Sequence, residues 1–222
     1  MEKNDEILEI KTSTVFADGL VFDFIGDYGE IIIYRPEQQI FTLLDPLHRL
    51  QTELSCSEID SFLANIRDRL LAKKDKFQAF VLNPSFDISA SEDESELILQ
   101  SKWLEYTLKT KLFEEEQLSQ AYFLFSNAYC KLNIYLNPGS TTPFARMEVN
   151  RILEERSRFP DEFHLTIWPK GKWFLGRTIK IESRHTLVRR LSERDEGRLV
   201  RALHFSRQFP KVSFTDYQKS LK

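Results

Sequence analysis

Apolar and polar residues alternate with a period of two over residues 7–54. Successive side chains of a β-strand point to opposite faces, so this alternation predicts half-buried strands. Short turns rich in glycine, aspartate and proline separate the strands, and connections this short require antiparallel neighbours. We therefore expect an antiparallel β-meander whose inner face carries Leu20, Phe22, Phe24, Ile31, Ile33, Ile40, Thr42, Leu44, Leu50 and Thr52.

Helical and alternating patterns follow one another in the middle of the chain. Apolar residues spaced three and four apart predict a helix over residues 55–74. Alternation returns further on and predicts three strands, over residues 86–91, 95–100 and 103–112.

The strongest helical pattern covers residues 114–136. Three glutamates open it, as suits a helix N-terminus, and Pro138 with Gly139 supplies the usual stop signals. Its residues are apolar nearly all round, so we expect the helix to be covered on more than one side. A further helix is predicted over residues 143–158.

The last part of the chain predicts strands over residues 163–168, 173–181 and 185–191. Ser192 with Asp195 then resembles the capped start of a helix over 193–208. These elements predict an α+β fold. We expect one domain over residues 1–222, with a long, curved, half-barrel-like antiparallel sheet and about four helices packed on its concave face.

Charge is distributed unevenly, although the net charge is only -3. Residues 1–164 hold 17 basic against 29 acidic residues, whereas residues 165–222 hold 14 against 5. In the preferred interpretation the basic C-terminal segment packs beside the acidic N-terminal part or solvates its own faces. Alternatively, it offers a cationic surface to an anionic ligand, a membrane face, RNA or a protein partner.

Several familiar chemistries are disfavoured. The phosphate loop, the dinucleotide fingerprint, the nucleophile elbow and the zinc-protease helix are all absent. Cys56 and Cys130 lack metal-ligand spacing and are interpreted as ordinary thiols, so we expect no cofactor and no metal. The apolar stretch 117–145 is broken by asparagine, proline and glycine, which argues against a transmembrane helix. Without a secretory signal at the N-terminus, the chain as written is expected in the cytoplasm, or in the periplasm or envelope if a leader was removed.

An arginine stripe is the first candidate site. Arg194, Arg198 and Arg201 are spaced i, i+4 and i+7, so they share one helix face and could bind phosphates through their planar guanidinium groups. Aromatic residues that could stack on bases are not interleaved with them, which disfavours nucleic-acid binding. A solvated or internally paired face is the preferred interpretation.

Aromatic residues on predicted inner faces form the second candidate. Core packing explains them by default, but a curved sheet could instead enclose an apolar or lipid-like ligand. In that hypothesis an anionic end of the ligand lies near a basic side chain. The ligand-binding residues would be Phe22, Phe24, Trp103, Tyr106 and Phe125, with Arg146, Arg184 or His185 at the anionic end.

Two histidines form the third candidate. His164 and His185 lie on or beside neighbouring predicted strands and could meet Asp161 or Glu162 in a metal or acid–base site. Scattered surface histidines are the preferred interpretation. The sequence contains no recognisable catalytic motif, so the enzyme alternative depends on the convergence of these two side chains.

Two segments carry a resemblance to a known family: Phe41-Thr42-Leu43-Leu44-Asp45-Pro46 with Arg49 to Leu54, and Asn137-Pro138-Gly139-Ser140 with Pro143-Phe144-Ala145-Arg146 and Val149-Asn150. They resemble an uncharacterised bacterial protein family, for which no activity is implied. Tyr34-Arg35 followed by Phe41 to Asp45 is also similar to the lipoprotein-carrier superfamily, whose curved antiparallel half-barrel holds acyl chains under helices. The missing export signal and the mid-chain helices depart from that superfamily.

Three functional hypotheses follow. The first is a binding or accessory protein that holds an apolar or lipid-like ligand between sheet and helices. The second is a structural or protein-interaction module without ligand, which uses the basic C-terminal segment. The third is an enzyme that uses His164 and His185.

Overall fold

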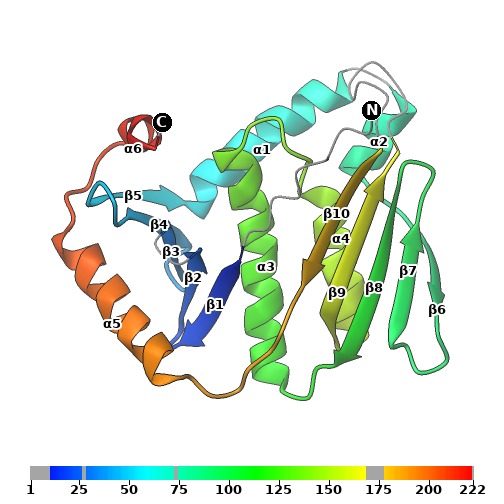
Figure 1. Ribbon diagram of the computed structural model, residues 1–222. Coiled ribbons are helices and arrows are strands. Elements are labelled where there is room, and N and C mark those ends of the chain that lie inside the picture. The colour runs from blue at the N-terminus through cyan, green and yellow to red at the C-terminus, as the bar shows by residue number, and fades with distance from the viewer. Residues whose placement is uncertain (1–10, 27–28, 73–74, 169–177, 222) are drawn as a thin grey trace, which may run out of the picture. The chain divides into compact units, whose positions relative to one another are not determined.

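The computed structural model describes residues 11–26, 29–72, 75–168 and 178–221. Its internal contacts divide the chain into two compact units (Figure 1). The first unit combines residues 1–58 with 189–222, and the second contains residues 59–188. Each unit contains a five-stranded antiparallel sheet, which confirms the predicted α+β class. The prediction of a single domain stays a prediction.

A helical segment separates the last strand of the first sheet from the first strand of the second. This segment contains α1 (Cys56–Leu71) and the short α2 (Lys76–Leu82). Helix α1 was predicted, whereas α2 was not expected. Asp75 caps α2, since its side chain accepts a hydrogen bond from the backbone N–H of Phe77 at 2.6 Å.

The first sheet is the predicted β-meander, with the strand order β1-β2-β3-β4-β5. Its strands are β1 (Thr12–Ala17), β2 (Leu20–Ile25), β3 (Ile31–Arg35), β4 (Ile40–Asp45) and β5 (Leu50–Ser55). Gly26 follows β2 with a φ of 67°, a conformation that glycine adopts without strain. Residues 7–10, which also fit the alternating pattern, lie outside the described residues.

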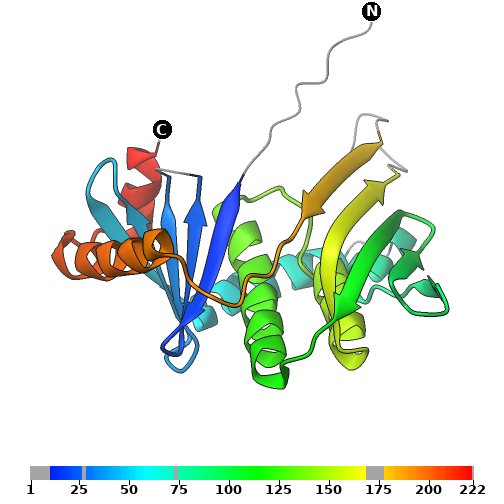
Figure 2. The ribbon, with the colours of Figure 1, turned by 60° about the horizontal axis from the view of Figure 1, so that its bottom comes forward.

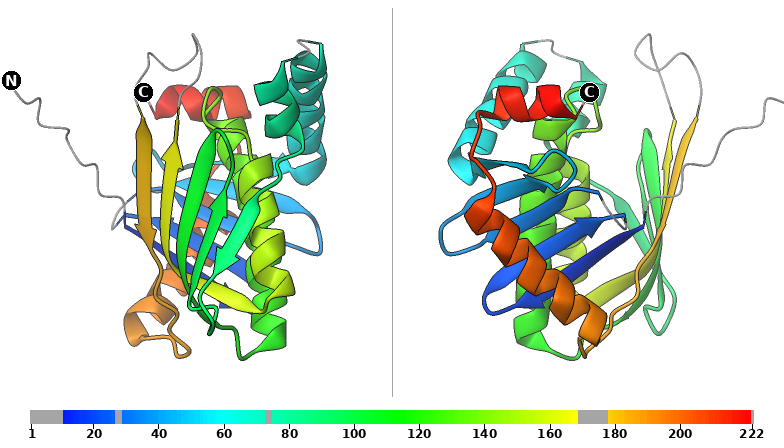
Figure 3. Two further views of the ribbon diagram at one scale, coloured as in Figure 1. Left: turned by 90° about the vertical axis from the view of Figure 1, so that its right-hand side faces the viewer. Right: turned by 60° about the vertical axis from the view of Figure 1, so that its left-hand side comes forward.

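Helix α5 (Glu193–Gln208) covers one face of the first sheet, and its bounds match the prediction. Figures 2 and 3 show it running across the strands of this unit. Ala202 of the helix is fully buried in a cluster with Phe22, Phe24 and Ile33. The predicted cap is confirmed: the Ser192 hydroxyl accepts from the Asp195 N–H, and the Asp195 carboxylate accepts from the Ser192 N–H.

The chain after α5 returns along the edge strand β5. The side chain of Gln51 donates to the carbonyl oxygens of Ser206 and Phe209. The backbone N–H of Gln51 donates to the carbonyl oxygen of Pro210. A final helix, α6 (Phe214–Ser220), was not expected from the sequence. Ser213 caps it by accepting a hydrogen bond from the backbone N–H of Asp216 at 3.1 Å.

The second sheet has the strand order β10-β9-β8-β7-β6. Its strands are β6 (Asp87–Ala90), β7 (Glu96–Gln100), β8 (Leu104–Leu112), β9 (Arg158–Ile167) and β10 (Ile179–Arg184). The three strands predicted over residues 86–112 are confirmed. Residues 173–177 of another predicted strand lie outside the described residues.

The strand predicted over residues 185–191 is wrong, because β10 ends at Arg184 and the chain continues without strand structure. The last paired residues are Arg184 and Glu162. The backbone N–H of His185 still donates to the carbonyl oxygen of Asp161 at 2.7 Å, and the chain then leaves the sheet. Leu187 and Val188, which follow, are 38% and 71% exposed, so no buried face holds a further strand there.

Three helices pack on one face of the second sheet (Figure 3). They are α2, α3 (Glu116–Leu136) and α4 (Phe144–Glu155). Phe123 and Leu153 contribute fully buried side chains to this core. Phe123 and Ile134 lie off the main apolar stripe of α3 and are nevertheless buried, as a helix covered on several sides requires.

No helix in the described ranges combines the length and the apolar character needed to cross a membrane.

Candidate functional site

A pocket of about 590 Å³ opens in the first unit, where two turns of the sheet meet α5. The turn after β2, the turn after β4 and the helix each supply part of its wall. All described lining residues belong to the first unit. The apolar part of the lining consists of Phe24, Ile25, Ile31, Pro46, Leu47 and Phe205.

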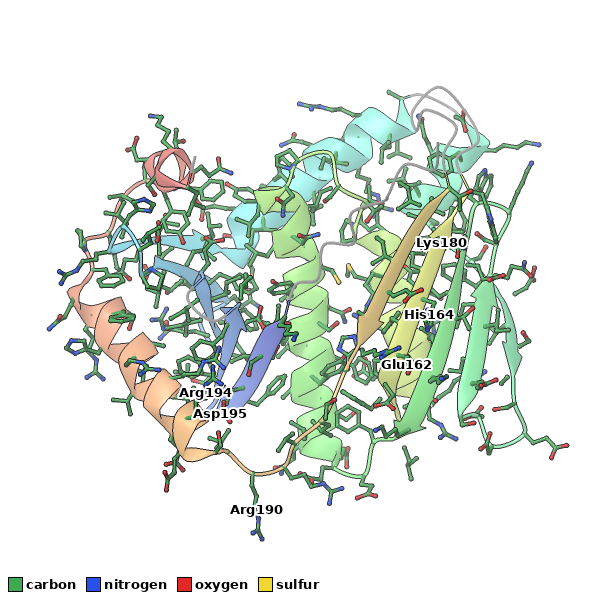
Figure 4. The ribbon with its side chains drawn as sticks, viewed as in Figure 1. Glu162, His164, Lys180, Arg190, Arg194 and Asp195 are labelled. Atoms are coloured by element: carbon green, nitrogen blue, oxygen red, sulfur yellow. The ribbon has the colours of Figure 1, made fainter. Side chains whose placement is uncertain are left out.

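Three arginines of one helix face form the basic wall of this pocket. Arg194, Arg198 and Arg201 all line it, so the arginine stripe predicted from the spacing faces a cavity of the protein. The capping box at Ser192 fixes where α5 begins, and therefore which residues face the sheet. Figure 4 labels Arg194 and Asp195 in the first turn of the helix.

Arg198 is held on two sides. Its guanidinium Cζ lies 4.1 Å from the centroid of the Phe24 ring, within the range of a cation–π interaction. Its Nη1 lies 3.9 Å from Oδ1 of Asp195, one turn earlier on the helix. The side chain is only 14% exposed, so this guanidinium has a fixed position in the wall of the pocket.

Arg201 differs from Arg198 in its surroundings. Within the described part of the chain, no acidic side chain lies within 4.0 Å of its guanidinium. The residue is exposed and lines the pocket. Its five N–H donors are therefore available to an anion that enters.

Glu30 is the acidic group among the described lining residues. Its Oε1 accepts a hydrogen bond of 2.7 Å from the Tyr217 hydroxyl of α6. Burial raises the pKa of the Glu30 carboxyl above its usual value, the nearby Asp45 carboxylate adds to this, and the Tyr217 hydrogen bond opposes it. In the described ranges, no cationic side chain lies within 4.0 Å of this carboxylate.

Asp45 shapes the neighbouring turn rather than the pocket interior. Its Oδ1 accepts from the backbone N–H groups of Leu47 and His48, and its Oδ2 lies 2.6 Å from Nδ1 of His48. Such local bonds are typical of aspartate at the start of a turn. They hold Pro46 and Leu47 where they form the apolar rim of the pocket.

The predicted ligand-binding residues are divided between the two units. Phe22 and Phe24 belong to the first unit, and of these two Phe24 lines the pocket, whereas Phe22 is buried in the core beneath α5. The second unit contains the other predicted residues: Trp103, Tyr106, Phe125, Arg146, Arg184 and His185.

Within the second unit, three of the predicted residues come together: Tyr106, Arg146 and His185. The Arg146 guanidinium lies over the Phe163 ring, with Cζ 3.8 Å from the centroid, and its charge acts on the ionisation of both Tyr106 and His185. The His185 ring lies 5.9 Å from the Phe163 ring. Burial, followed by the Arg146 charge, lowers the pKa of His185 to about 4, so the imidazole is neutral at pH 7.

The buried side-chain amide of Asn150 positions Arg146. The Nε of Arg146 donates to Oδ1 of Asn150 at 3.0 Å, and the Asn150 Nδ2 donates in turn to Ser126 and Asn127 of α3. Asn150 is completely buried, so this network joins α3 to α4 inside the core.

The remaining predicted residues lie elsewhere in the second unit. Trp103 packs against Phe77 and Phe80 of α2, and Phe125 packs against Tyr129 on α3. The Arg184 side chain is 83% exposed, with its Nε 3.8 Å from Oε1 of Glu162.

His164 and His185 lie on opposite faces of the second sheet. His164 is on the face of β9 that carries Glu162, and its Nδ1 lies 3.6 Å from Oε1 of Glu182 on β10 (Figure 4). His185 instead contacts the inward rings of Phe159 and Phe163. The two imidazoles therefore share no site. In the described ranges, no three histidine, cysteine, aspartate or glutamate side chains could together hold a metal ion.

The sequence patterns predicted the three arginines and Phe24 as candidate site residues, but not the other walls of the pocket. Glu30, Pro46 and Leu47 lie in turns far from α5 in the sequence, and no local signal connects them to it. Comparisons of this chain with protein-family models, with curated proteins and with solved structures find no match.

Proposed function

We propose that the protein is a binding or accessory protein whose pocket in the first unit holds a small anion with an apolar body. The observation that carries the proposal is the combination of three guanidinium groups and six apolar side chains around one pocket of about 590 Å³. Ligand pockets of proteins commonly have volumes of about 300–1,000 Å³ and combine apolar walls with a few polar groups.

The arginine wall suits an anionic group for two reasons. A guanidinium presents N–H donors in a planar fork that matches carboxylate and phosphate oxygens. Arg198 is also held in place by Phe24 and Asp195, so less conformational entropy is lost when it binds a ligand. Arg201 adds a guanidinium with no acidic partner among the described residues.

The apolar lining suits the body of the ligand. Phe24, Ile31 and Phe205 lie on the core side, and Leu47 lies at the rim, where its side chain is 79% exposed. A bound alkyl chain would cover this exposed leucine, which is favourable by about 25 cal/mol for each Å² of apolar surface removed from water. Alkyl carboxylates and alkyl phosphates are the simplest ligands with both features.

Isothermal titration calorimetry with octanoate and with octyl phosphate tests the proposal. The unmodified protein is expected to bind at least one of the two, and Arg201→Gln is expected to weaken binding about tenfold, because a charge-assisted hydrogen bond is lost. Arg207→Gln is the matched control, since Arg207 is exposed on the same helix and does not line the pocket.

Two results would overturn the proposal. One is that neither acid binds; the other is that the two variants bind equally well. If neither acid binds and the association state changes with salt, the protein-interaction hypothesis is favoured instead.

A further inference from the structure

Glu30 and Arg201 line the same pocket without pairing with each other. Glu30 has no cationic side chain within 4.0 Å, and Arg201 has no acidic side chain within 4.0 Å, as far as the described residues extend. Glu30 belongs to the sheet side of the pocket and Arg201 to the helix side, and their charged groups are more than 4.0 Å apart.

The Glu30 carboxylate is oriented rather than loose. Tyr217 is 1% exposed, and its hydroxyl donates to Oε1 of Glu30 at 2.7 Å. The cap at Ser213 fixes the start of α6 and hence the position of Tyr217. This arrangement uses one of the two carboxylate oxygens, and each carboxylate oxygen can accept more than one hydrogen bond.

Burial of a carboxylate without a cation is unfavourable, and a ligand cation would offset this cost. The two neighbouring carboxylates, in contrast, already have hydrogen-bond or ionic partners. Asp45 is engaged by His48 and by two backbone N–H groups, and Asp195 is engaged by Ser192 and Arg198. Neither of them lines the pocket.

We propose that the ligand is amphoteric: its acidic group binds the arginines of α5, and a primary ammonium group binds Glu30. This inference rests on the proposed anion-binding function and adds a second recognition group to it. The ligand class is an apolar molecule with a carboxylate or phosphate at one end and an amine at the other. Aminoalkyl carboxylates and aminoalkyl phosphates share this chemistry.

Matched probes that differ only in the amine test the inference by calorimetry. The pairs are octanoate with 8-aminooctanoate, and octyl phosphate with 8-aminooctyl phosphate. In the unmodified protein the amine is expected to tighten binding about tenfold in at least one pair, as one charge-assisted hydrogen bond permits. The pair that responds tells a carboxylate ligand from a phosphate ligand.

The Glu30→Gln variant provides the decisive comparison. Glutamine keeps an oxygen that can accept from Tyr217 but cannot attract the ammonium. We expect this variant to lose the preference for the amine, whereas its affinity for octanoate or octyl phosphate should not fall, because a negative charge in the pocket is removed. Thermal denaturation of the variant checks that it is folded.

The outcomes separate the two proposals. If the simple acids bind through Arg201 but the amine adds nothing, or adds equally in Glu30→Gln, the amphoteric ligand is excluded and the anion-binding function stands. If none of the four probes binds, both proposals are overturned.

Discussion

The guanidinium of Arg198 lies over the ring of Phe24, with Cζ 4.1 Å from the ring centroid. Arg198 belongs to α5 and Phe24 to β2, so the contact joins the returning C-terminal helix to the N-terminal meander. It lies in the wall of the pocket, where both residues are lining residues. The same contact therefore contributes to the stability of the first unit and to the shape of the proposed binding site.

Arg198→Met should lower the free energy of unfolding by about 0.5–1 kcal/mol, because methionine keeps apolar contact with the Phe24 ring but loses the cation–π attraction. Urea denaturation measures this difference. Arg207→Met is the control, since Arg207 is exposed on the same helix. Equal stability of the two variants would show that the Phe24 contact contributes nothing.

Ser192→Ala should lower the free energy of unfolding by about 1 kcal/mol, because the Asp195 N–H loses its acceptor at the start of α5. Ser192→Thr keeps a hydroxyl at the cap and should have a smaller effect. Amide hydrogen exchange in the first turn of α5 should rise in the alanine variant. Unchanged exchange there would contradict the role of the capping box.

Asn150→Leu should destabilise the second unit by about 1–3 kcal/mol, since it leaves the half-buried Ser126 and Asn127 of α3 and the Nε of Arg146 without their hydrogen bonds to a buried amide. Asn133→Leu is the matched control on α3, where the Asn133 side chain is exposed and accepts a hydrogen bond from the Asn137 amide. Thermal denaturation compares the two variants. An equally small loss in both would argue against the buried network.

His185 should make stability depend on pH in the acidic range. Its pKa is about 4 in the folded protein, below the usual 6.5, so the unfolded chain binds more protons between these values. The free energy of unfolding should therefore fall as the pH falls from about 6.5 to about 4. The charged groups that act on the ring are Arg146, which lowers its pKa, and Asp161, which raises it.

A His185→Gln variant should show a weaker fall in stability over this pH range, measured by urea denaturation at several pH values. His204→Gln is the control, because His204 is exposed on α5. If His185→Gln retains the full pH dependence, another group is responsible.

Local patterns predicted most of the elements, and the parts that they missed have physical reasons. The meander and α5 follow from alternation, from short turns and from the Ser192 cap, which act over a few residues. Helices α2 and α6 have seven residues each, too few for a clear apolar period. The cap residues Asp75 and Ser213 could have revealed them.

The candidate site was predictable only in part. Helical spacing placed Arg194, Arg198 and Arg201 on one face, but not which surface that face meets. Glu30 and Leu47 meet the arginines of α5 only because the chain returns from the second unit to the first, a long-range relationship that no local pattern contains. The strand expected over residues 185–191 failed for a similar reason, since a strand needs a paired neighbour and the pairing of β10 with β9 ends at Arg184 and Glu162.

Two-dimensional ¹H–¹⁵N NMR of the full chain, titrated with octyl phosphate and octanoate, tests the central claim most directly. The account predicts that chemical shift changes concentrate at the pocket, including the backbone amides of Gly29, Leu47 and Arg201. Absence of any change, or changes confined to the surroundings of Arg146 and Phe163 in the second unit, would contradict the assignment of the binding site to the first unit.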